Sequence, residues 1–408
     1  MSAVNRKIFA ETPLDTNWEP ERGRIGLLVT CCAVNALYAI YFGAISVLLP
    51  AIGAAFRTGA AAQGRLFPAN FAGMIVGVLM SGTLSDRFGR RSVLLGGAAL
   101  FGFGLLLFGA APGFGLALLA APLIGAGSGG MVTVAGALVS DLFPERRAVV
   151  LNLTQIMFGV GAAVGPSLTK FLLGMGVGWR FLYHALALAM LGAFLAIWFQ
   201  PAPKRASASG AMNWTDLRGL LKQPAFAILC VSQGFYAGAE VGFFQWMPTY
   251  FQTLAGGAAW SGIVVSVFWI SMTAGRIAAG SLLERVPLLP FGMTLAVCGA
   301  LSAICALLVS NPLLVLCFVA LTGLFFSGIY SVILAEAAHC FAHRAGTVFG
   351  GIAALAGIGC ALSPWAVGAI GASPLGWRVG LSLSPLLALC VAGNLLLLKK
   401  IGGRHRTH

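Results

Sequence analysis

The sequence predicts an all-α membrane protein with twelve transmembrane helices in two pseudo-symmetric six-helix bundles. Hydrophobic residues make up 59% of the 408 residues and charged residues only 9%, and the mean hydropathy is +0.93. These values lie outside the range of soluble domains. Apolar windows of about 20 residues, the length that crosses a bilayer, recur twelve times along the chain. The second half of the chain also repeats motifs of the first half at one constant offset.

The predicted spans follow one another with short connections. The first six cover 25–50, 65–84, 92–110, 114–140, 149–174 and 180–200, and the second six cover 225–252, 260–282, 290–310, 312–337, 347–370 and 379–398. The domain organisation that follows is a cytoplasmic N-terminal tail (1–24), an N-terminal six-helix bundle (25–200), a cytoplasmic linker (201–224), a C-terminal six-helix bundle (225–398) and a basic cytoplasmic tail (399–408).

Positively charged residues indicate the orientation in the membrane. The formal net charge is +14, and most Lys and Arg lie in the connections on the side of the N-terminal tail. By the positive-inside rule, both termini are predicted to face the cytoplasm of a multi-pass protein of the plasma membrane, such as a bacterial inner membrane. The basic residues flank apolar spans and form no continuous basic face. This pattern excludes nucleic-acid binding.

Residue patterns of enzymes and of cofactor or metal sites are not found. The 9 cysteines lie within or beside apolar runs without metal-type spacing, so we expect them to pack in the core. No nucleotide-binding loop, Ser-His-Asp set or Cys-His pair stands out. The sequence therefore predicts neither catalysis nor an ATP-driven step, and no cofactor.

An internal repeat divides the chain into two similar halves. Gly82-x-Leu84-x-Asp86-Arg87 recurs as Gly280-x-Leu282-x-Glu284-Arg285, and Gly178-Trp179-Arg180 recurs as Gly376-Trp377-Arg378; Gly125 finds Gly323. Each pair is 198 residues apart. Because each copy contains six predicted spans, the two copies start on the same side of the membrane, which predicts a parallel duplication.

The stretch 82–91 is a glycine-framed run of charge between two apolar spans, which predicts a tight basic turn. It resembles the loop signature G-x-L-x-D-R-x-G-R-R of the major facilitator superfamily of transporters, and every position is met. The resemblance implies the fold of that family and a latch that holds the two halves together on the cytoplasmic side. The alternative is that these arginines only set the topology. The latch residues are Gly82, Asp86, Arg87, Gly89, Arg90, Arg91, Asp141 and Arg146.

The fifth span carries small residues at four-residue spacing and an internal proline, Gly161-x-x-x-Gly165-Pro166, and the eleventh carries the copy Gly359-x-x-x-Ser363-Pro364. Small residues let helices approach closely and proline kinks a helix. We therefore predict a hinge at a helix interface, formed by Gly161, Gly165, Pro166, Gly359 and Pro364. The segment resembles the antiporter signature G-x-x-x-G-P-x-x-G-G of drug exporters, but Thr169 and Lys170 replace its closing glycines.

The seventh span places an acid, Glu240, deep in an apolar helix. Offsets of three and seven residues put Gln233, Tyr236 and Glu240 on one helix face. A carboxylate at bilayer depth costs about 2.5–3.5 kcal/mol, so such a group is a candidate for proton or sodium coupling. The alternative is a permanently protonated structural acid. We also predict an ion pair between Arg276 and Glu336 at the cytoplasmic gate, and a substrate cavity lined by Asn35, Tyr38, Gln155, Gln233, Tyr236, Gln245, Trp246, Trp269 and Tyr330.

Three segments resemble the fucose and glucose proton symporters within the superfamily: 236–242 with 246–250, 151–153, and 346–350. The resemblance implies a monomeric secondary active transporter that moves a small polar, sugar-like solute by alternating access, with a proton or sodium ion coupled through Glu240 and the lipid bilayer as its surroundings. A drug or metabolite exporter stays open. So does an organic-anion carrier that uses Arg57, Arg65 and Lys170 as an outer vestibule, and a non-transporting sensor or scaffold.

Overall fold

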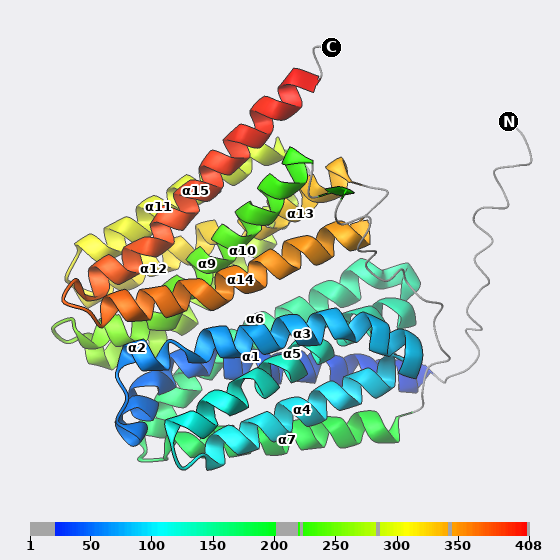
Figure 1. Ribbon diagram of the computed structural model, residues 1–408, viewed down its shortest axis with the longest axis horizontal. Coiled ribbons are helices and arrows are strands. Elements are labelled where there is room, and N and C mark those ends of the chain that lie inside the picture. Colours follow the sequence, from blue (N-terminus) through cyan, green and yellow to red (C-terminus); the bar gives the residue numbers. More distant parts are fainter. Residues whose placement is uncertain (1–20, 201–218, 221–222, 283–285, 342–344, 406–408) are drawn as a thin grey trace, which may run out of the picture.

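The computed structural model describes residues 21–200, 219–220, 223–282, 286–341 and 345–405 (Figure 1). In the first part of the chain the elements are α1 (Glu21–Phe56), α2 (Ala60–Gln63), α3 (Leu66–Phe88), α4 (Arg90–Ala110), α5 (Phe114–Leu142), η3 (Pro144–Arg146), α6 (Arg147–Gly174) and α7 (Trp179–Phe199). In the second part they are α9 (Pro224–Gln252), η4 (Gly257–Trp260), α10 (Ile263–Leu282), α11 (Leu288–Leu308), α12 (Pro312–Phe326), α13 (Ile329–Cys340), α14 (Ala345–Gly371) and α15 (Gly376–His405). The described residues contain no strand, so the predicted all-α fold is confirmed.

The helices match the predicted spans. By length and composition, 11 described segments can cross a membrane, and a shorter apolar helix, Ile263–Ala278, lies within the predicted span 260–282. One of these segments, Pro312–Cys340, combines α12 and α13, which are separated at Ser327 and Gly328. The predicted basic turn is shorter than expected, because α3 continues to Phe88. The chain turns at Gly89, whose φ of 84° is a conformation that favours glycine.

Two bundles are visible in Figure 1: the first half, α1–α7, and the second half, α9–α15. Helix α1 begins and α15 ends at the same end of the molecule, which we call the termini end; the opposite end is the far end. Between the halves, α14 packs on α3, α10 on α6 and α9 on α1. The ribbons of the two halves lie against each other near α2, at the far end, and spread apart toward the termini end.

Residues related by the sequence repeat make equivalent close contacts between helices in the two halves. A Cβ added at Gly125 would lie 1.8 Å from the Asn70 carbonyl oxygen, and one at Gly323 would lie 2.5 Å from the Phe268 carbonyl oxygen. Phe268 is the repeat partner of Asn70, as Gly323 is of Gly125. Each half therefore uses the same backbone-to-backbone contact, between α5 and α3 in the first half and between α12 and α10 in the second, as expected for a duplicated bundle.

Candidate functional site

Four aromatic rings meet between the halves near the middle of the bundle. Phe42 of α1 and Phe158 of α6 come from the first half, and Phe244 of α9 and Trp269 of α10 come from the second. The ring centroids are 5.4 Å apart for Phe42 and Phe244, and 5.5 Å apart for Phe158 and Trp269. Both pairs are T-shaped, the arrangement that aromatic rings prefer. We call these four residues the aromatic plug. It packs the two halves together across the centre.

Hydrogen bonds join the halves on the far side of this plug. Ser167 and Ser266 are 2.7 Å apart through their hydroxyls, and the Lys170 ammonium donates to the Ala258 carbonyl over 3.2 Å. A cavity of about 230 Å³ lies in the same region. It is lined by Val47, Pro50, Ala51, Lys170, Leu173, Gly174, Pro248, Gln252 and Ser261. Lys170 is therefore bound to the other half rather than free in an outer vestibule.

Glu240 lies one helical turn from Phe244, on the termini side of the plug, and is buried. Its carboxylate interacts electrostatically with the guanidinium of Arg276, which comes from α10. Tyr236, one turn away on α9, and Tyr330 of α13 belong to the same electrostatic cluster. Glu240 and Arg276 do not form a direct ion pair among the described residues. The two charges are thus close enough to influence each other while both side chains keep donors or acceptors for a ligand.

Arg276 occupies a position that the sequence did not predict. Its guanidinium lies over the Trp269 ring, 5.9 Å from the centroid, and Nη2 lies 3.5 Å from the Met272 sulfur. The predicted ion pair with Glu336 was wrong, because that pair is not formed and Glu336 instead contacts the Cys340 thiol. Side chains of a helix lean toward its N-terminus, which for α10 is the far end, so Arg276 reaches the buried acid and the aromatic plug rather than the membrane edge.

Several polar atoms of α9 and α10 are buried without a hydrogen-bond partner among the described residues: Gln233 Oε1, Gln245 Oε1 and Trp269 Nε1. A buried polar atom left unpaired costs about 1–3 kcal/mol, so each of these atoms is a place for water or a solute to bind. The Tyr236 hydroxyl interacts with the Glu240 carboxylate.

The other predicted cavity residues divide between the interior and the exposed surface. In α1, the buried Asn35 donates to the Cys31 carbonyl over 3.2 Å, and the Tyr38 hydroxyl lies 3.7 Å from the Met74 sulfur. Tyr330 is 44% exposed although it lies in the electrostatic cluster of Glu240. Gln155 is exposed, one turn toward the termini end from Gly159, where α6 approaches the second half. Of the predicted set, Tyr236 and Tyr330 share the electrostatic cluster of Glu240, and the place of the others in a substrate cavity stays a prediction.

Comparison with known proteins decides the family. The family model described as Major Facilitator Superfamily matches residues 31–364, which is most of the chain. The chain belongs to the Major Facilitator Superfamily. Proteins of this family are transporters of small molecules and are not enzymes.

Sequence relatives and solved structures of the superfamily agree with this assignment. Human protein spinster homolog 1 is 28% identical over 56% of this chain and 46% of its own length. The chain spans less than half the length of this and of other curated relatives that it matches. A bacterial homolog of the human lysosomal transporter spinster, in an inward-facing and occupied conformation, has a TM-score of 0.79 at 16% identity and covers 94% of this chain and 98% of its own. A D-xylose-proton symporter has a TM-score of 0.74 at 14% identity, with 91% and 97% covered.

The superfamily loop signature makes contacts within the first half. Arg90 forms an ion pair with Asp141 and donates to the Ala137 carbonyl over 2.5 Å, which ties α4 to α5. Arg91 donates to the Ile197 and Trp198 carbonyls at the end of α7. Asp86 is exposed and has no ion-pair partner among the described residues. Gly82, where an added Cβ would meet no atom within 4 Å, is exposed as well, as are Arg87 and Arg146.

A latch between the halves therefore stays a prediction for this superfamily member. The contacts of Arg90 and Arg91 stabilise the first half as a unit in this conformation.

The predicted hinge residues lie at close contacts inside each half. A Cβ at Gly161 would lie 2.4 Å from the Ala36 carbonyl oxygen, and one at Gly165 would lie 2.5 Å from that of Ile40, which sets α6 on α1. Gly359 approaches the Gly234 carbonyl in the same way and sets α14 on α9. Pro166 and Pro364 lie inside continuous helices. These contacts hold each half rigid, and their role as hinges stays a prediction.

Trp246 is packed against both halves. It is 0% exposed, its Nε1 donates to the Pro364 carbonyl over 2.6 Å, and its ring centroid lies 5.0 Å from that of Trp377 and 6.1 Å from that of Phe67. These contacts give Trp246 a packing role, and its place in the substrate cavity stays a prediction. The face of α9 that carries Gln233, Tyr236 and Glu240 differs from the face that carries Trp246, since offsets of six and ten residues turn the helix away.

This difference predicts opposite effects for two tryptophans. Trp246→Phe removes a buried hydrogen bond and should lower the free energy of unfolding by about 1–2 kcal/mol without changing the apparent affinity of the transported solute. Trp269→Phe removes an indole N–H that has no partner among the described residues, beside Arg276, and should weaken that affinity with little loss of stability. Thermal unfolding and solute-driven flux, measured on both variants, check the contrast. Equal behaviour of the two would contradict it.

Proposed function

We propose that this transporter moves a small polar solute across the plasma membrane by alternating access, with a proton coupled through Glu240. The observation that carries the proposal is the buried acid that interacts with Arg276 and Tyr236, on helices α9 and α10 that also carry unpaired buried polar atoms. A purely apolar cargo does not satisfy such atoms, whereas hydroxyl and amide groups do. The proton-coupled activity named for the xylose symporter that shares this fold supports the same reading.

Glu240 and Arg276 suggest how proton and solute are linked. When Glu240 is ionised, its charge holds the guanidinium of Arg276. When Glu240 takes a proton, that attraction ends, and Arg276 becomes available to hydrogen-bond the solute. Proton binding and solute binding at the one site then favour each other, which is the reciprocity that coupling requires.

The conformation supports a defined direction of access. The aromatic plug and the hydrogen bonds of Ser167 and Lys170 join the halves on the far side, and the halves spread apart toward the termini end (Figure 1). Because Lys and Arg concentrate at the termini end, we assign this end to the cytoplasm. On this assignment, we propose that the conformation is one that exchanges solute with the cytoplasm. Engagement of Lys170 by Ala258 leaves no support here for the organic-anion vestibule.

Flux measurements in proteoliposomes test this function. Liposomes that contain a pH-sensitive dye and the purified protein are exposed to sugars, other neutral polar metabolites, carboxylates and cationic drugs. We expect one or more neutral polar solutes to start proton movement, and an imposed pH gradient to drive accumulation of the same solute. Proton movement with cationic drugs alone would support the exporter alternative instead. A dependence on sodium without any dependence on pH would contradict proton coupling.

A further inference from the structure

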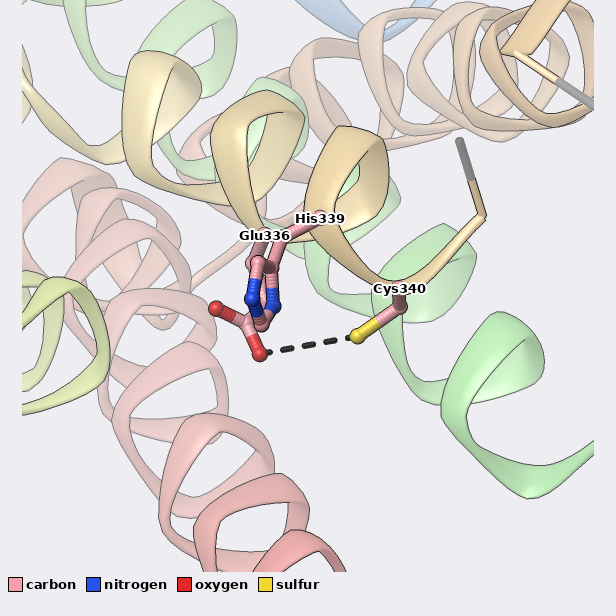
Figure 2. Close-up of side chains that lie close together, drawn as sticks. All are labelled: Glu336, His339 and Cys340. Carbon is pink, nitrogen blue, oxygen red and sulfur yellow. Dashed lines mark hydrogen bonds between the residues drawn. The ribbon is translucent and has the colours of Figure 1, made fainter. Parts of the chain in front are cut away.

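Three potential metal ligands meet at the termini end of α13, away from the substrate site. Figure 2 shows the side chains of Glu336, His339 and Cys340 close together on one face of the helix. The carboxylate, imidazole and thiol ligand atoms all lie within 4.8 Å of one another. The Cys340 sulfur lies 3.6 Å from Glu336 Oε1. Offsets of three and four residues place all three side chains on neighbouring turns, so the helix itself fixes the arrangement.

The geometry fits a small divalent ion. Zinc binds thiolate at about 2.3 Å and carboxylate oxygen at about 2.0–2.2 Å, usually with tetrahedral angles. These values give a separation of about 3.6 Å between sulfur and oxygen ligands of one ion. The observed separation of Cys340 and Glu336 equals this value. Small rotations of the imidazole of His339, which is exposed, complete a three-ligand set with a fourth position for water.

The charge balance around Glu336 favours a cation. The chain has 25 Lys and Arg against 11 Asp and Glu. Even so, this half-buried carboxylate has no cationic side chain within ion-pair distance among the described residues. Arg276, its predicted partner, lies over Trp269 instead. A bound metal ion would supply a positive charge to this carboxylate.

The sequence contained a signal for this cluster that we did not use. Glu336-x-x-His339-Cys340 carries three different ligand types within five residues at helical spacing. This motif is neither a Cys-x-x-Cys pattern nor a pair of separate Cys and His residues, and Glu336 was already assigned to an ion pair with Arg276.

We propose that Glu336, His339 and Cys340 form a binding site for a divalent transition-metal ion of the zinc class. The mixed oxygen, nitrogen and sulfur donors suit zinc or cobalt and not magnesium or calcium, which prefer oxygen alone. When the metal–sulfur bond forms, the thiol proton leaves to solvent and the thiolate binds the ion. The site is separate from Glu240, and it does not depend on which solute is transported.

Cobalt titration of the full-length protein, purified in detergent without a polyhistidine tag, tests this site. Thiolate bound to Co²⁺ gives a ligand-to-metal charge-transfer band in the near ultraviolet, which carboxylate and imidazole ligands do not give. We expect one equivalent of Co²⁺ to produce this band and Zn²⁺ to abolish it by displacement. Cys340→Ser should remove the band. His339→Ala and Glu336→Gln should weaken the affinity at least about tenfold.

A matched control is Cys317→Ser, which removes another exposed cysteine on α12 and should keep the band. Zn²⁺ should raise the melting temperature of the wild type and of this control, but not that of Cys340→Ser. Equal melting temperatures of all variants without metal show that each one folds. The proposal is overturned if the wild type gives no thiolate band at millimolar Co²⁺, or if Cys340→Ser keeps it.

Discussion

Glu240→Gln is expected to abolish accumulation of the solute against its gradient. The amide has nearly the same shape as the acid but cannot take up or release a proton, so Arg276 is no longer alternately held and released. Loss of only 1.4 kcal/mol of coupling lowers the accumulation ratio tenfold, and we expect at least that loss. Exchange of labelled solute at equal concentrations on both sides needs no net proton movement and should continue. Uptake driven by a pH gradient and solute exchange, measured on the same proteoliposomes, check both parts.

The control for this prediction is Glu21→Gln, which removes an acid at the start of α1, outside the apolar segment Gly23–Phe56. It should accumulate solute as the wild type does. Glu240→Asp keeps a titratable group and should restore part of the accumulation. If Glu240→Gln accumulates solute as well as the wild type does, the acid is a structural one, and the coupling assigned to it falls.

Gly125→Ala is expected to cause a large loss of stability. The new Cβ would lie 1.8 Å from the Asn70 carbonyl oxygen, and neither backbone can move without separating α5 from α3. Overpacking of a rigid contact costs about 3 kcal/mol or more when backbone must shift. A lower melting temperature in detergent and a smaller yield of monodisperse protein are the measurements.

Gly192→Ala in α7 is the matched control, because an added Cβ there meets no atom within 4 Å. It should leave the melting temperature equal or slightly higher, since alanine favours the helix by up to about 1 kcal/mol over glycine. The repeat adds a second test: Gly323→Ala should reproduce the effect of Gly125→Ala, as its Cβ would lie 2.5 Å from the Phe268 carbonyl oxygen. Equal melting temperatures of the Gly125 and Gly192 variants would refute the close-packing argument.

The fold was predictable because bilayer thickness and a constant repeat leave few alternatives. Twelve apolar windows and motif pairs 198 residues apart determined the span count and the two halves, and the contacts of Gly125 and Gly323 follow the same repeat in the structure. The end of α3 was not predictable from apolar character, since its last turn is polar and the helix continues until Gly89 allows a positive φ.

Site residues were harder, because a polar residue in a helix can face several neighbours. Glu240 is conspicuous in the sequence because a carboxylate in the bilayer is unfavourable in free energy. Helical spacing then placed Tyr236 and Gln233 on the same face of the helix. The partner of Arg276 depends on which helices are adjacent and on the direction of its long side chain. Arg276 and Glu336 were paired only because both lie near the cytoplasmic ends of their predicted spans, and Glu240 was not considered. Composition does not distinguish an indole that lines a site from one that donates to a backbone carbonyl, as Trp246 does to Pro364.

Glu240 and Arg276 both lie in the second half, on α9 and α10. Rocking of one half against the other therefore leaves the distance between these two charges unchanged and alters only the water that can reach them. In the proposed mechanism, the arrival of a proton or a solute changes the interaction between Glu240 and Arg276. The movement of the halves decides from which compartment that proton or solute arrives. In this arrangement the coupling ion and the solute bind at one site within the second half. The first half moves relative to that site and changes its access to water.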